Sequence, residues 1–178
     1  LPEDDQRKIE NARSLLNGTR TLFLIEAVNG ILSGNNHPIC WSSAKVDNTT
    51  PQFHHKITYY NKTNSARMYQ LESRDAYWGV GTRHLVPMVS IGVPDEKAKY
   101  YNITTDNLLY EAEQHCLVIG NPNNRSCMHW VASDNLGTNR TLCNNAFFNN
   151  CTSFTGSWYF WRQTCDKNNQ PKNLTNTI

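Results

Sequence analysis

The chain opens with apolar residues at helical spacing. Ile9, Ala12, Leu15 and Leu16 recur at intervals of one to four positions on one helical face, and Gly18 follows directly. Acidic residues at positions 4 and 5 suit the start of a helix, and a glycine suits the position just beyond its end. The pattern predicts an amphipathic helix within residues 1–18.

Between residues 19 and 134 the pattern changes to short runs rich in β-branched and aromatic residues, separated by clusters of Asn, Gly, Pro and Ser. The runs that we predict as strands are 21–27, 39–46, 53–60, 67–71, 82–91, 99–104, 108–119 and 127–132. Eight strands joined by polar turns and interrupted by no helix favour an all-β fold, an antiparallel sandwich or barrel. A barrel of about eight strands is wide enough to hold one small ligand.

After residue 134 a second helical pattern begins. Leu142, Ala146, Phe147 and Asn150 share one helical face, and an aromatic cluster follows at 158–161. We expect this helix to pack on the barrel as part of a closing segment, 135–167, and the polar residues 168–178 to form a loose tail. Because the 178 residues contain neither repeats nor a low-complexity linker, we predict a single domain, 1–178.

Charge and hydropathy exclude several classes of protein. The 17 Lys and Arg residues nearly balance the 15 Asp and Glu residues and are scattered singly, which argues against nucleic acid as a partner. The longest apolar stretches, 21–28 and 85–93, are far shorter than the roughly 18 residues of a membrane-spanning helix. The first residues are acidic and polar, so we expect any signal peptide to have been removed.

Cysteines and glycosylation motifs together place the chain outside the cell. The six cysteines include no CxxC pair, which favours three disulfides over a metal site. Spacing alone leaves their pairing open. Eight Asn-x-Ser/Thr motifs predict N-glycans, and the one at Asn150 is the weakest because its middle residue is a cysteine. The eight acceptors are Asn17, Asn48, Asn61, Asn102, Asn124, Asn139, Asn150 and Asn173. We therefore predict a secreted, extracellular glycoprotein.

From about residue 110 to residue 165 the spacing resembles the salivary lipocalins of ticks, the histamine-binding-protein-like family. The residues that carry this resemblance are Cys116, the run Cys127-Met128-His129-Trp130, Cys143 and Cys165. In that family a late strand carries a cysteine or tyrosine, an acidic residue, an aliphatic residue and a tryptophan, and a cysteine-bearing helix follows. The motif match covers this third of the chain, whereas the layout of helices and strands agrees over most of it.

The resemblance implies an eight-stranded antiparallel lipocalin barrel, with an N-terminal helix and a C-terminal helix packed on it. It also implies the disulfides Cys40–Cys165, Cys116–Cys143 and Cys127–Cys151. Proteins of this family trap amines, leukotrienes, fatty acids or sterols, and some engage host immune proteins directly. The chemistry of the barrel interior must decide among these ligands.

On a strand that begins at Cys127, Met128 and Trp130 share a face, and we expect that face to point inward. Amine-binding relatives carry an acid at the position of Met128, whereas methionine suits a sterol, fatty acid or eicosanoid better than a cation. The other expected lining residues are Phe23, Trp41, Ile57, Tyr59, Trp78, Val89 and Ile91. The competing interpretation for each is packing at the closed end of the barrel. A ligand carboxylate would meet Arg67, Arg74 or Arg83 near the mouth.

These observations predict a secreted salivary protein that sequesters a mostly apolar host ligand to modulate immunity or inflammation. Two alternatives stay open: a histamine or serotonin trap, if Glu111 and Glu113 face inward, and a protein that acts on a host immune protein through its surface loops. We expect no enzyme, cofactor or metal. His54 and His55 are adjacent, so on a strand they face opposite sides, and no GxSxG, P-loop or GxGxxG motif is present.

Overall fold

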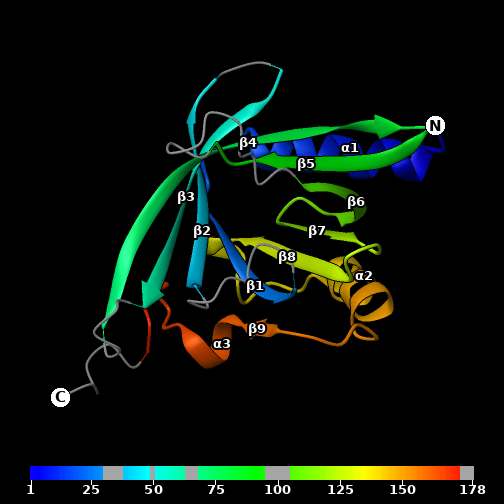
Figure 1. Ribbon diagram of the computed structural model, residues 1–178. Helices are drawn as coiled ribbons and strands as arrows, with labels where there is room; N and C mark the ends of the chain where they lie inside the picture. Colours follow the sequence, from blue (N-terminus) through cyan, green and yellow to red (C-terminus); the bar gives the residue numbers. More distant parts are fainter. Residues whose placement is uncertain (30–37, 49–50, 63–67, 95–104, 173–178) are drawn as a thin grey trace.

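The computed structural model describes residues 1–29, 38–48, 51–62, 68–94 and 105–172 (Figure 1). Its helices are α1 (Glu3–Leu16), α2 (Thr141–Cys151) and the short α3 (Trp161–Thr164), with a 3-10 turn at Ser133–Asn135. Its strands are β1 (Leu22–Val28), β2 (Ile39–Asp47), β3 (Phe53–Lys62), β4 (Tyr69–Arg83), β5 (Val86–Gly92), β6 (Thr105–Ala112), β7 (Cys116–Asn121), β8 (Ser126–Ala132) and β9 (Trp158–Phe160). Within these ranges none of the helices has the length and apolar character that crossing a membrane requires.

Strands β1 to β8 form a closed antiparallel barrel. Each pairs with its neighbour in chain order, and β1 completes the ring by pairing with both β2 and β8. Strand β9 is not one of the eight strands of the ring and pairs with β1 from Glu26 to Val28. The predicted all-β class and the eight-stranded barrel are confirmed.

Several strand boundaries differ from the prediction. The run 67–71 contains only the first residues of the long strand β4, whose charged middle hides its alternation. The run 82–91 is divided by a tight turn in which His84 and Leu85 both have positive φ, 49° and 64°. This is the backbone that a two-residue hairpin requires, although neither residue is a glycine or asparagine.

The run 108–119 is likewise two strands, β6 and β7, joined by a turn in which Glu113 N–H donates to the carbonyl of Cys116 at 2.9 Å. The sequence showed no Gly or Pro at this turn. Strand β9, within the aromatic cluster, was not predicted, and the predicted strand 99–104 lies outside the described residues.

Buried side chains form two clusters on opposite sides of the barrel wall. The inner core fills the barrel and extends under α1, which contributes Ile9, Ala12, Leu15 and Leu16. The outer core lies between α2 and strands β1, β7 and β8; its residues are Val28, Cys116, Val118, Cys127, Val131, Cys143, Phe147 and Cys151. Helix α1 therefore packs against the inner core, and α2 packs on the outside of the barrel beside β8 (Figure 1).

Three disulfides connect these layers, and their pairing is the one that the family resemblance implied. Cys116–Cys143 and Cys127–Cys151 attach α2 to β7 and β8, and Cys40–Cys165 attaches the C-terminal segment to β2. Residues 168–178 were expected to form a loose tail, but the described part of it, 168–172, is attached to the barrel. Asn169 is buried, and its Nδ2 donates to the carbonyl of Cys40 at 2.9 Å.

Candidate functional site: the barrel interior

Eight of the nine predicted lining residues lie together in the inner core. They are Trp41, Ile57, Tyr59, Trp78, Val89, Ile91, Met128 and Trp130, and all are buried. Phe23 is not brought into this cluster, because the neighbouring Leu22 and Leu24 take the inward positions of β1. The Phe23 ring instead stacks on Trp161, with 6.2 Å between ring centroids.

The two innermost tryptophans make different hydrogen bonds. Trp78 and Trp130 are fully buried and meet edge to face, with 5.5 Å between ring centroids. Trp78 Nε1 donates to Ser43 Oγ at 3.1 Å. Trp130 Nε1 is buried and has no hydrogen-bond partner among the described residues. Because a buried N–H without a partner costs about 1–3 kcal/mol, this group is a donor suited to a bound ligand.

A directional chain of hydrogen bonds lies where α1 meets the barrel wall. His55 Nε2 lies 2.7 Å from the carbonyl of Leu16, which can only accept, so Nε2 carries the proton. Its Nδ1 then accepts from Ser43 Oγ at 2.8 Å, and Ser43 accepts in turn from Trp78. Burial lowers the pKa of His55, which keeps the ring neutral. These bonds attach the last turn of α1 to the barrel wall.

A second set of polar side chains surrounds Tyr59, on strands β3 and β4. Trp41 stacks on Tyr59 with 4.4 Å between centroids. Glu72 stands directly opposite Tyr59, and Arg74 directly opposite Ile57, so both share the inward face. Burial raises the pKa of the Tyr59 hydroxyl, which also interacts with Glu72 and Arg74. Of the three candidate arginines, Arg74 is the one in register with a predicted lining residue, although its side chain is exposed.

The other two arginines do not share this position. Arg83 pairs with Asp106 at 3.3 Å, and Arg67 lies outside the described residues. Sequence reasoning missed Glu72 as a neighbour of Tyr59, because the partnership depends on the register between β3 and β4. The alternation of charged residues along residues 70–75 was the only available signal.

The acidic pair that an amine trap would need does not face inward. Glu111 Oε1 accepts from Arg7 Nη2 at 2.7 Å and from the backbone N–H of Ala112 at 3.0 Å. Glu113 Oε2 accepts from the backbone N–H of Cys143 at 3.0 Å, on the side of the barrel that α2 covers. Strand β6 ends at Ala112, so Glu113 lies in the following turn and the two residues do not share a strand face.

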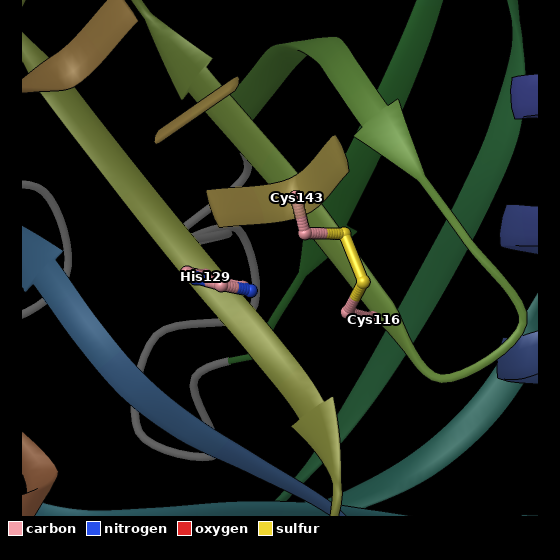
Figure 2. Close-up of side chains that lie close together, drawn as sticks. All are labelled: Cys116, His129 and Cys143. Carbon is pink, nitrogen blue, oxygen red and sulfur yellow. A yellow bond between two sulfur atoms is a disulfide. The ribbon is translucent and has the colours of Figure 1, made fainter. Parts of the chain in front are cut away.

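One group of side chains has metal-ligand character. Cys116, His129 and Cys143 have their ligand atoms within 4.8 Å of one another, and all three are buried. Figure 2 shows that the two sulfurs are bonded to each other beside the His129 ring, so neither is available as a thiolate. Bonded cysteines leave a single histidine, which does not make a metal site.

The predicted glycan acceptors differ in accessibility. Asn17, Asn48, Asn124 and Asn139 are exposed. Asn61 and Asn150 are half-buried, and each already donates from Nδ2: Asn61 to Glu72, and Asn150 to the carbonyl of Ala146. Asn102 and Asn173 lie outside the described residues. The first four therefore offer the better acceptors.

Comparison with known proteins gives a consistent picture. A family model described as tick histamine binding protein matches residues 3–167. No curated protein sequence matches. Japanin from Rhipicephalus appendiculatus, solved bound to cholesterol, aligns with a TM-score of 0.59 at 14% identity over 82% of this chain and 93% of that chain. Lobster apocrustacyanin A1 aligns with a TM-score of 0.46 at 12% identity over 89% of this chain and 82% of that chain. The alignment with Japanin and the closed eight-stranded sheet show a lipocalin-like barrel.

Proposed function

Because the chain belongs to the tick histamine-binding protein family, we propose that it is a secreted glycoprotein that holds one small, mostly apolar host ligand inside its barrel. The observation that carries this proposal is the pairing of Met128 and Trp130 on the inward face of β8. Met128 supplies an adaptable apolar surface, and Trp130 supplies a buried N–H without a partner. Such a site binds through buried apolar area and orients its ligand by few hydrogen bonds.

The chemistry of the interior favours a sterol, a fatty acid or an eicosanoid. Each has a long apolar body and an oxygen that can accept from Trp130 Nε1. The cholesterol bound to Japanin makes a sterol a reasonable first candidate. The carboxylate of a fatty acid or eicosanoid would accept hydrogen bonds from the Tyr59 hydroxyl and the Arg74 guanidinium. Sequestration of such a mediator would modulate host immunity or inflammation without catalysis.

The proposal is tested by mass spectrometry of the organic extract of protein purified from eukaryotic cells. We expect about one equivalent of a sterol, fatty acid or eicosanoid. Trp130→Ala should reduce this amount, whereas Phe148→Ala, on the exposed side of α2, should leave it unchanged. An empty extract followed by tight histamine or serotonin binding in calorimetry would replace the proposal with an amine trap. An immunomodulatory effect that survives Trp130→Ala would indicate action through the surface.

A further inference from the structure

A concave site on the outside of the barrel is formed by β1, the segment before α2, and the short helix α3. We call it the arginine cavity. It has a volume of about 360 Å³, and its charged residues are Arg140, Arg162 and Glu26. Its apolar lining residues are Ile25, Leu136, Phe160 and Trp161. Sites for small molecules typically have volumes of about 300–1,000 Å³ and combine apolar walls with a few polar groups.

The charges in the arginine cavity do not cancel. Of the described residues that line it, Glu26 is the one acidic group, and its carboxylate compensates one of the two guanidinium charges. Glu26 Oε1 accepts from His129 Nδ1 at 2.9 Å, and burial lowers the pKa of His129 in spite of this carboxylate. The imidazole is therefore neutral and adds no charge. One positive charge of the cavity is left without a counterion in its lining.

Arg140 is held firmly in this cavity. Its Nη1 donates to three backbone carbonyls of residues 135–138, at 3.0, 2.9 and 3.1 Å, and its Nε is buried without a partner among the described residues. Burial lowers the pKa of Arg140; Glu26 and, more weakly, Glu113 oppose this shift, and the positive charge of Arg162 adds to it. An arginine nevertheless stays protonated in proteins. Two like charges thus lie close together, and a bound anion would relieve their repulsion.

Arg162 is the more available of the two cations. It is exposed, and within the described residues its guanidinium makes neither a hydrogen bond nor an ion pair. The preceding residue, Trp161, supplies a fixed apolar wall: its Nε1 donates to Asn169 Oδ1 at 3.0 Å, and its ring stacks on Phe23. Neighbouring positions of α3 therefore provide a cation and a flat apolar surface. A preformed site loses less conformational entropy on binding than one that must be ordered.

We propose that the arginine cavity binds a small organic acid, with its carboxylate between the two guanidinium groups and its apolar body against Trp161. A planar carboxylate matches the paired N–H donors of arginine. A single negative charge balances the positive charge that Glu26 leaves over, whereas a more highly charged ion would be repelled by Glu26. An inorganic ion would leave the apolar lining in water. This site is separate from the barrel interior and does not depend on the ligand proposed for it.

The test uses the complete glycoprotein, labelled with ¹⁵N, and the indole N–H signal of Trp161, which is identified by its loss in Trp161→Phe. The probe is 3-phenylpropanoate, and 3-phenylpropanamide is the matched neutral compound. We expect the acid to shift the Trp161 signal and to bind about tenfold more tightly than the amide. Arg162→Gln should remove most of this preference, whereas Arg125→Gln, the same change in the exposed turn between β7 and β8, should preserve it.

A second variant tests the charge balance in the opposite direction. Glu26→Gln removes the negative charge of the cavity, and glutamine can still accept from His129, so the acid should bind more tightly and the amide equally well. Near-ultraviolet circular dichroism checks the fold of both variants.

Three results would overturn the proposal directly: equal affinity for the two compounds, an unchanged preference in folded Arg162→Gln, or no gain in affinity for the acid in folded Glu26→Gln. A shift of the Trp78 signal without a shift of the Trp161 signal would also overturn it, since the probe would then lie in the barrel interior. Sulfate that displaced the acid at equal concentration would do the same, because the apolar walls would then contribute nothing.

Discussion

His55 donates a hydrogen bond from Nε2 to the backbone carbonyl of Leu16, 2.7 Å away, and so joins strand β3 to the last turn of α1. In the neutral ring Nδ1 accepts from Ser43 Oγ, whereas Nε2 donates to Leu16 in either protonation state. Protonation at Nδ1 would remove this acceptor from Ser43 and place a charge in a buried site. The stability of the fold around His55 thus depends on pH.

The first prediction concerns this dependence. The pKa of His55 is lowered from 6.5 by burial, so the unfolded chain takes up the proton at a higher pH than the folded chain. Stability is complete above about pH 6.5 and falls as the pH drops from there toward the lowered pKa. Chemical denaturation between pH 5 and 8 should show this loss, and His55→Gln should flatten it. An unchanged slope in the variant would show that other groups are responsible.

His54 should titrate in the opposite direction. Its two ring nitrogens lie 3.0 Å from Asp47 and 2.9 Å from Asp75, and hydrogen bonds to these carboxylates, Asp75 first, raise its pKa above 6.5. The protonated ring stabilises the fold below pH 6.5, and this contribution disappears as the pH rises through the raised pKa. NMR titration should show Asp75→Asn lowering the pKa of His54, with Asp134→Asn, which pairs with Arg20 instead, as the control.

The three disulfides should differ in their contribution to stability. Cys40–Cys165 closes a loop of 125 residues and Cys127–Cys151 one of 24. The chain-entropy model assigns them roughly 5 and 3.5 kcal/mol. Replacing both cysteines of each pair by serine should therefore lower the free energy of unfolding more for the first pair. The reverse order would show that the packing of α2, rather than loop closure, dominates.

Trp130→Phe separates the hydrogen bond from the apolar area in ligand binding. The variant keeps an aromatic ring in the inner core but lacks Nε1. For a ligand with one oxygen near this ring, affinity should fall about five- to tenfold, the worth of a single hydrogen bond. Fluorescence competition with the ligand identified from the extract measures this loss. If binding is unchanged, Trp130 is a packing residue only.

Glycan occupancy should follow the accessibility of the acceptors. Peptide mapping should find Asn124 and Asn139 more fully modified than Asn61, whose Nδ2 would have to leave Glu72. Asn61→Gln should accordingly change the intact mass least among these three. High occupancy at Asn61 would mean that the Glu72 contact forms only in chains that escape modification.

Sequence patterns predicted the parts of the fold that depend on local spacing. The face of α1 was correct because Ile9, Ala12, Leu15 and Leu16 all meet the inner core. The face of α2 was only partly correct: Phe147 is buried, but Leu142 is 46% exposed, because the two disulfides set the rotation of the helix. A disulfide joins residues that are far apart in the sequence, so the spacing of apolar residues within the 11 residues of α2 does not predict its effect.

The same distinction holds for the sites. Met128 and Trp130 were placed inward by alternation along one strand, which is a local property. The neighbours Tyr59 and Glu72 depend on pairing between strands, and Glu26 lies opposite Phe160 only because β9 pairs with β1. These relationships have no signature in a single sequence without an alignment.

Strand β1 exchanges one neighbour for another along the same edge. It pairs with β2 through Leu22 and Phe23 only, and from Glu26 onward β9 takes that place. Within the described residues, no other ladder of the barrel has as few as two residue pairs. The barrel is therefore held together most weakly between β1 and β2. Heat or denaturant should separate β1 from β2 first and leave an open, curved sheet of eight strands. The Cys40–Cys165 disulfide would still connect β2 to the C-terminal segment. Hydrogen exchange would register this as early loss of protection at Leu22 and Ser43, the amides on either side of the parting line.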